Sequence, residues 1–220
     1  MKFLATSALL LVLTAAPAQA SEVFGVAEVK DPHSKLYKAV AKERLKNWRK
    51  ITKKYLHDVA RGGKDSNEFR GQILKLRGKT KLETMFNVNK YVNDKITYRT
   101  DNETWENNEY WANPIETVGK GSYGDCDDYA LAKYFALQQL GFQEKHLNFI
   151  ALMSEGGGHA VLAVKEKGKT YILDNNLQVP VADERIDFYD PIYAVNNKSF
   201  KLYKPLPDSK AKNSKTSSGK

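Results

Sequence analysis

The chain has only one cysteine among its 220 residues. A lone cysteine excludes an internal disulfide, so the fold must be stabilised by packing or by a bound ion. The histidines are scattered and form no cluster with cysteine of the kind that holds zinc. No apolar run long enough for a membrane helix follows residue 20, and no internal repeat is visible. These absences exclude disulfide-rich, repeat and integral membrane proteins, and they leave a globular chain with one unpaired thiol.

The first twenty residues have the form of a secretory signal peptide. Lys2 supplies positive charge, residues 3–15 are apolar, and Ala18-Gln19-Ala20 fits a small-residue cleavage site. We therefore expect cleavage after Ala20 and an exported product. The remaining chain is long enough for one domain with a full hydrophobic core.

Positive charge is concentrated in two places. The formal net charge is +9, and lysine and arginine gather in residues 35–54 and in the serine-rich tail 207–220. The tail has few apolar residues, which predicts disorder. No nucleic-acid motif accompanies these basic residues in a chain that we expect to be exported, which argues against nucleic-acid binding. We interpret the first stretch as a solvated helix face, attracted to anionic envelope surfaces or to an acidic partner.

The hydrophobic pattern changes its period along the chain. Apolar residues at three- and four-residue steps predict helices over 36–59, 66–76 and about 80–92. Residues 97–124 are polar, aromatic and rich in turn formers, so we expect one long loop there. An amphipathic helix then runs from Cys126 to Gly141.

Alternating apolar residues predict strands in the last part of the chain, at 147–153, 160–165, 169–173, 192–195 and 200–203. Helices that precede an antiparallel sheet indicate an α+β protein. We expect a single domain over 21–206, with a helical part at 35–95 and a catalytic core at 96–206.

Three residues suggest nucleophilic catalysis. Cys126 falls at a helix start, where unpaired N–H groups and the helix dipole favour a thiolate. His159 in GGGHAVLAV and Asp174 in YILDNN follow on predicted strands. This order suggests a nucleophile, its base and the residue that orients the base. Each residue also has a purely structural interpretation. Cys126 could be a buried thiol, His159 a hydrogen-bonded strand histidine, and Asp174 a turn residue at the end of a strand.

Carboxylates surround the cysteine at Asp125, Asp127 and Asp128. Such acids are common capping partners at helix N-termini. Beside a thiol, however, they raise its pKa and oppose thiolate formation. A bound cation would neutralise them, and hard oxygen ligands favour Ca²⁺ over zinc. We expect calcium ligands at Asp125 and Asp127 first, with Asp128 as a third candidate and further ligands in the loop 101–109.

Three motifs follow one another in the sequence: WANPIETVGKGSYGDCDDYALAKYFALQQLGF, GHAVLAV and TYILDNN. With these motifs, the chain resembles the bacterial transglutaminase-like cysteine proteinases over about residues 88–176. The resemblance implies a papain-like/transglutaminase-like fold, with Cys126 as nucleophile, His159 as base and Asp174 as orienter. It also implies calcium dependence through the acids that flank the cysteine, although Asp127 stands where glutamate is usual in the family. Trp111 either supplies an indole N–H to the oxyanion, as a tryptophan does in transglutaminases, or only packs the wall of the site.

By the same resemblance, the protein is a calcium-dependent cysteine endopeptidase of the periplasm. Its substrate would be a large cell-surface adhesin cut near the N-terminus, which controls adhesin release and biofilm dispersal. Its partner would be an inner-membrane cyclic-di-GMP receptor that sequesters the protease. Three alternatives stay open on the same fold: a transglutaminase-type acyl transferase, a peptidoglycan amidase and a catalytically silent binding module.

Overall fold

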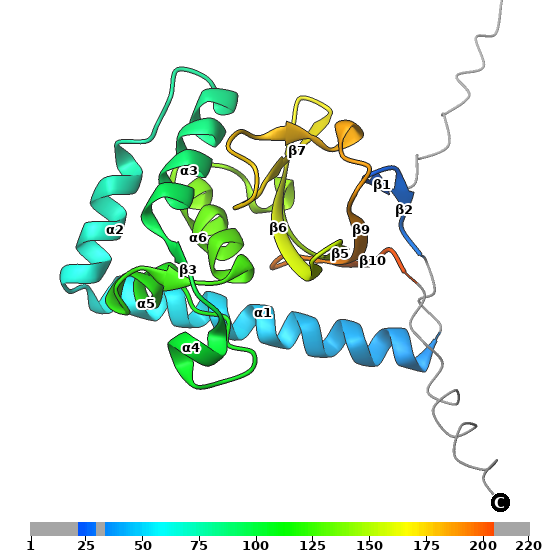
Figure 1. Cartoon of the computed structure of the whole chain (residues 1–220), viewed down its shortest axis with the longest axis horizontal. Coiled ribbons are helices and arrows are strands. Elements are labelled where there is room, and N and C mark those ends of the chain that lie inside the picture. The colour runs from blue at the N-terminus through cyan, green and yellow to red at the C-terminus, as the bar shows by residue number, and fades with distance from the viewer. Residues whose placement is uncertain (1–21, 30–33, 205–220) are drawn as a thin grey trace, which may run out of the picture.

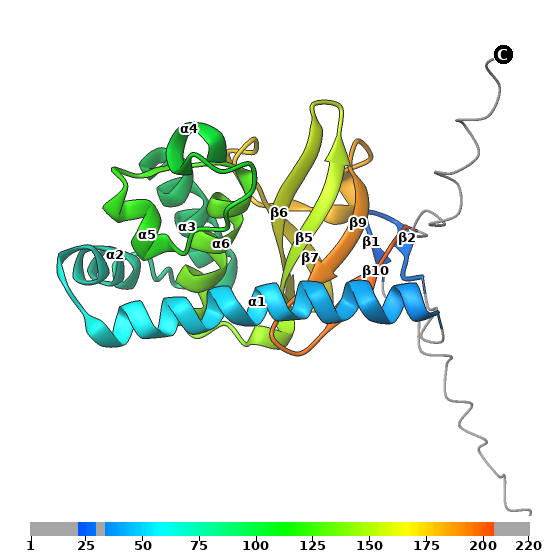
Figure 2. The ribbon, with the colours of Figure 1, turned by 90° about the horizontal axis from the view of Figure 1, so that it is seen from below.

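The computed structural model describes residues 22–29 and 34–204. The predicted signal peptide at 1–20 and the basic tail at 207–220 lie outside the described residues. A helical half and a sheet half stand side by side, and helix α1 (Lys35–Arg61) runs along both of them (Figures 1 and 2). Within the described ranges, no helix is both long enough and apolar enough to cross a membrane.

The helical half contains the three helices expected from the sequence, which are α1, α2 (Lys64–Leu74) and α3 (Lys81–Lys95). Helix α1 begins where the Ser34 side chain accepts a hydrogen bond from the Tyr37 N–H, and it ends at Gly62 with a positive φ of 71°. Thr80 caps α3 by accepting a hydrogen bond from the Glu83 N–H. These ends follow the capping signals of the sequence.

The sheet half is a six-stranded sheet in the order β10-β9-β5-β6-β7-β8, with every neighbouring pair antiparallel. The five predicted strands are β5 (Leu147–Ser154), β6 (Gly157–Glu166), β7 (Lys169–Leu173), β9 (Asp190–Val195) and β10 (Phe200–Leu202). Short elements not predicted are β1 (Glu22–Val23), β2 (Val26–Ala27), β8 (Val181–Ala182) and the 3-10 turns Glu144–His146 and Asp183–Arg185. The expected α+β class is confirmed.

The prediction of one long loop over 97–124 was wrong. The segment forms β3 (Thr97–Tyr98), α4 (Asp101–Trp105), α5 (Pro114–Gly119) and β4 (Tyr123–Gly124). Both helices are too short to show a hydrophobic period, and local capping defines them instead. Asn113 and Glu116 form a capping box around Pro114 at the first turn of α5, and Thr100 and Glu103 form one at α4.

Helix α6 (Cys126–Gln139) lies at the centre of the molecule, between α3 and the sheet (Figure 1). The sequence predicts an amphipathic helix here, but residues 127–137 are buried without a break. Helices cover one side of α6 and the sheet covers the other, so no face remains for solvent. The start of α6, which carries the cysteine, is therefore fixed by packing along the whole helix.

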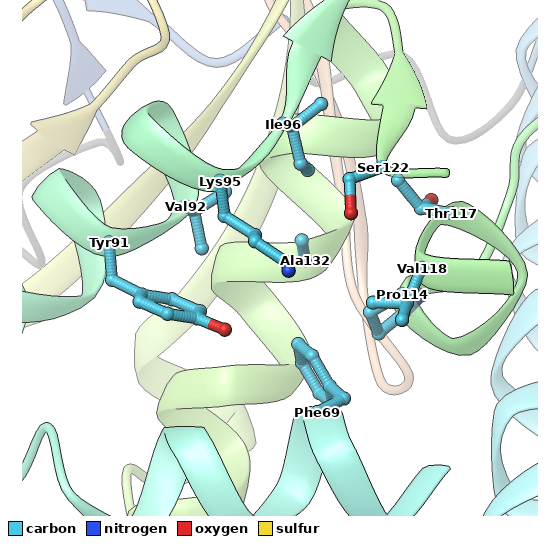
Figure 3. A pocket seen from close by; sticks show the side chains of 10 residues that line it. All are labelled: Phe69, Tyr91, Val92, Lys95, Ile96, Pro114, Thr117, Val118, Ser122 and Ala132. Atoms are coloured by element: carbon cyan, nitrogen blue, oxygen red, sulfur yellow. The ribbon is translucent and has the colours of Figure 1, made fainter. Parts of the chain in front are cut away.

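A small pocket lies where α2, α3, α5 and α6 meet, and Phe69, Tyr91, Pro114 and Ala132 are among its walls (Figure 3). Its volume of about 20 Å³ is the space of roughly one water molecule. A peptide or a small substrate cannot enter it. The functional site must therefore lie elsewhere.

Helix α6 also buries a charged side chain. Lys133 is 0% exposed, and its Nζ has no hydrogen-bond partner among the described residues. Burial lowers the pKa of Lys133 to about 7, while the negative charge of Asp174 acts in the opposite direction. Folding therefore costs free energy wherever the unfolded chain would carry this lysine protonated.

Replacing Lys133 with Met removes this cost and keeps a long, unbranched side chain. Between pH 7 and pH 10.5 the unfolded wild type binds more protons than the folded protein, so wild-type stability rises with pH across that window. We expect the variant to be more stable by about 2–5 kcal/mol below pH 7, with the gain shrinking towards pH 10.5. Urea denaturation at a series of pH values measures the difference.

The matched control is Lys90→Met, since Lys90 is exposed on α3 in an ion pair with Asp94. Its effect should be small and nearly independent of pH. A Lys133→Met variant that is less stable than the wild type at every pH would show that the ammonium group is stabilised in the fold.

Candidate active site

Cys126 is the first residue of α6 and is partly buried. Asp125 caps the helix, because its side chain accepts a hydrogen bond from the Asp127 N–H at 3.3 Å. Burial raises the pKa of the Cys126 thiol to about 12, and the charges of Asp127 and Asp125 add to the shift. The backbone N–H groups of Ala160 and Asp127 act against it. The fold thus brings the thiol against strand β6 at Ala160, directly after His159.

His159 on β6 and Asp174, directly after the end of β7, form a buried pair. His159 Nε2 lies 2.9 Å from Asp174 Oδ1, and their side chains are 7% and 0% exposed. The Asn176 N–H donates to the same oxygen, and the Tyr189 hydroxyl donates to Oδ2. Burial alone would raise the pKa of Asp174, but these hydrogen bonds and the His159 charge hold it below its ordinary value. The carboxylate is therefore ionised and fixed in place at neutral pH.

Two residues that support this pair were missed in the sequence. Tyr189 contacts both partners, since its ring centroid lies 5.6 Å from that of His159. Asn93 on α3 donates from Nδ2 to the backbone carbonyl of Asp174 at 2.9 Å, which ties the helical half to the end of β7. Neither residue belongs to a local motif. An aromatic residue in the irregular segment before β9 was the only signal.

An acidic cluster adjoins the thiol. One carboxylate oxygen each of Asp101, Asp125 and Asp127 lies within 4.8 Å of the others. Oδ1 of Asp101 and Oδ1 of Asp127 are buried without a hydrogen-bond partner among the described residues. Burial, and then the neighbouring carboxylates, raise the pKa of Asp125 to about 6 and that of Asp127 well above its usual range. Such converging, unpartnered oxygens fit a hard cation such as Ca²⁺.

Of the three predicted ligands, the structure brings together Asp125 and Asp127 but not Asp128. The fully buried Asp128 turns into the protein, where Oδ1 accepts a hydrogen bond from the Ala112 N–H at 2.8 Å. A side chain at Gly124 would come within 2.6 Å of Asp128, so the turn before the helix needs glycine there. Asp101, at the first position of α4, takes the third place in the cluster.

Trp111, in the segment before α5, packs against the sheet. Its ring centroid is 4.7 Å from that of Phe149, and its indole N–H donates to Glu109 Oε1 at 3.1 Å. An oxyanion role, which stays a prediction, would require the indole to exchange this hydrogen bond for one to the substrate.

Comparison with known proteins agrees with this geometry. A sequence model described as bacterial transglutaminase-like cysteine proteinase matches residues 47–185. The calcium-bound structure of LapG from Legionella pneumophila has a TM-score of 0.56 and 25% identity, over 74% of this chain and 91% of LapG. EGTA-treated LapG from the same organism has a TM-score of 0.56 and 26% identity, over 71% and 86%. No matching relative is found among curated proteins.

The family match spans more than half of the chain, and the calcium-bound LapG structure covers 74% of it. Together they establish both the fold and the chemical class. The chain belongs to the bacterial transglutaminase-like cysteine proteinases and is a cysteine protease.

Proposed function

We propose that this protein is a calcium-dependent endopeptidase of the periplasm that cuts a large cell-surface adhesin near its N-terminus. Release of the adhesin would control biofilm dispersal. An inner-membrane cyclic-di-GMP receptor of the LapD type would sequester the protease. The similarity to LapG supports this assignment, and the signal-like sequence of residues 1–20 supports export.

The observation that carries the proposal is that Cys126 lies near two preformed groups. Its sulfur is near the Ala160 N–H on β6, and Ala160 follows His159, which is paired with Asp174 at 2.9 Å. The charges of Asp125 and Asp127, which form a cluster with Asp101, also act on the thiol. A structural thiol needs neither neighbour, whereas a nucleophile needs a base and a compensated charge.

In the proposed reaction, the Cys126 thiol transfers its proton to His159 and the sulfur attacks the carbonyl carbon of the scissile peptide bond. The oxyanion accepts a hydrogen bond from the Cys126 backbone N–H at the start of α6. His159 then protonates the leaving amine, and water releases the acyl group from the sulfur. Asp174 holds the imidazole and stabilises its protonated form.

Calcium would be held by Asp101, Asp125 and Asp127. When bound, it supplies positive charge that offsets these carboxylates beside the thiol. Asp127 would bind the ion with a side chain shorter than the glutamate that is usual in the family. Asp101 on α4 would be the third ligand. Asp128 stays a structural residue in this assignment, because its carboxylate anchors Ala112.

Cys126→Ala should abolish proteolysis while the variant stays folded. His159→Ala should be similarly inactive, and Asp174→Asn should lose roughly 10³–10⁴-fold in rate, because the imidazole loses its orientation. Surface proteins of the source bacterium are incubated with each variant, and new N-termini are labelled and sequenced. The proposal expects one dominant cut near the N-terminus of a large surface protein.

Two parallel assays separate the alternatives. Incorporation of a fluorescent amine would indicate acyl transfer, and release of stem peptides from purified cell wall would indicate an amidase. Wild-type cleavage by Cys126→Ala would contradict the cysteine mechanism itself.

A calcium chelator should silence the protease, and calcium but not zinc should restore it. Calcium should also raise the Tm by roughly 5–10 °C at a concentration 100-fold above its Kd, because it binds only the folded cluster. Asp101→Asn and Asp127→Asn should lose most of this shift. Calorimetric titration and thermal melts measure binding independently of activity.

The matched control for the calcium experiment is Asp94→Asn, an exposed acid on α3 that is paired with Lys90. It should keep the full calcium response. If Asp101→Asn binds calcium as the wild type does, the ion binds elsewhere in the protein.

A further inference from the structure

A basic cleft lies beside the candidate active site. Its volume is about 480 Å³, and it runs between α1 and the segment just before α5. Its walls are Arg44, Asn47, Lys50, Ile51 and Lys54 from α1, and Glu109, Tyr110 and Trp111 from the segment. The cleft thus combines three basic side chains with two aromatic ones and a single acid, Glu109, whose Oε1 accepts a hydrogen bond from the Trp111 indole N–H.

Two of the basic groups have no carboxylate partner within the described part of the chain. Lys54 is paired with Asp58 at 3.2 Å and with Glu116 at 3.3 Å. Lys50 makes no ion pair with the described residues, and Arg44 Nε is buried without a hydrogen-bond partner among them. The Arg44 guanidinium lies 5.1 Å from the ring centroid of Tyr193. Arg44 is half-buried, and a guanidinium that has no carboxylate partner and one unsatisfied N–H favours an incoming anion.

The cleft connects to the thiol through one row of the sheet. Tyr193 on β9 pairs with Ala151 on β5, and Ala151 pairs with Ala160 on β6. The Ala160 N–H faces the Cys126 sulfur. Neighbouring strands are about 4.8 Å apart, so Arg44 above Tyr193 stands roughly 10 Å from the strand beside the nucleophile. An extended peptide covers that distance in about three residues.

Tyr193 is influenced by charges from both regions. Burial raises the pKa of its hydroxyl most, Arg44 and Glu109 of the cleft lower and raise it respectively, and Asp127 of the acidic cluster raises it, so the ring lies within reach of both the cleft and the cluster. An anionic side chain of a peptide in the site would be attracted towards Arg44 and away from the carboxylates. This field would fix the direction in which the peptide lies.

We propose that the cleft is a substrate subsite that binds an aspartate or glutamate about three residues from the scissile bond. Arg44 binds the carboxylate, Lys50 adds positive charge, and Trp111 contacts the peptide backbone or a neighbouring apolar side chain. The proposal rests on the endopeptidase function proposed above, and it assigns a role to the basic face of α1.

The test uses protein substrates that carry the cut site mapped by N-terminal sequencing. Asp, Asn, Glu, Gln or Lys is placed in turn at each position two to four residues from the cut, on both sides. For one position, the wild type should show a kcat/KM about tenfold higher with an acid than with its amide. Arg44→Gln should bring this ratio close to one, and Arg44→Glu should favour lysine instead.

Lys53→Gln is the matched control, because Lys53 is an exposed base on α1 outside the cleft. It should keep the wild-type ratio. Cleavage with no preference for acid at any position would overturn the subsite and leave the protease function intact, as would an Arg44→Gln variant that keeps the preference. If the wild type cuts no protein at all in calcium, the proposed function fails, and the subsite fails with it.

Discussion

Negative charge buried at the start of α6 is the constraint on which the rest of the structure depends. Asp127 and Asp128 are buried, and Asp125 is partly buried beside them. Each must be compensated locally, because an unpaired carboxylate in a protein interior is costly. Asp128 is compensated only in part: its Oδ1 accepts from the Ala112 N–H and anchors the segment before α5, whereas its Oδ2 is buried without a hydrogen-bond partner among the described residues. Asp125 and Asp127 instead converge with Asp101, and the demand for a cation follows from this arrangement.

The proposed catalytic groups are carried by two layers that pack against each other. Helix α6 carries the thiol, whereas the sheet carries the imidazole and its carboxylate. The sheet pair is already ordered, since Tyr189 and Asn176 bind Asp174 and Asn93 reaches across from α3. The helix start instead carries unpartnered carboxylate oxygens, whose charge a bound cation would offset. Burial of α6 on every side makes rigid displacement of the thiol expensive, which again leaves charge as the available control.

Much of this could be read from the sequence, and the limits have physical reasons. Periods of 3.6 and 2 identified the three N-terminal helices and the five longer strands, because each has an apolar face. Spacing alone could not find Asp101, which joins the cluster from a helix too short to show a period. Tyr189 and Asn93 contact Asp174 through tertiary packing, without any local motif. Lys133 was invisible for a different reason, since a lysine in an amphipathic pattern is normally expected on the solvent side.

If the subsite assignment holds, the charges of the acidic cluster and of the basic cleft act together on the substrate. Charges of both Arg44 and Asp127 act on Tyr193, so a peptide acid in the cleft would experience both. With its cation bound, the cluster contributes little net repulsion, and the field of Arg44 and Lys50 dominates. Without the cation, the carboxylates of Asp101, Asp125 and Asp127 oppose the approach of an acidic substrate and also oppose the thiolate of Cys126. Loss of the ion would then weaken substrate binding and nucleophile activation together, because the same charges govern both.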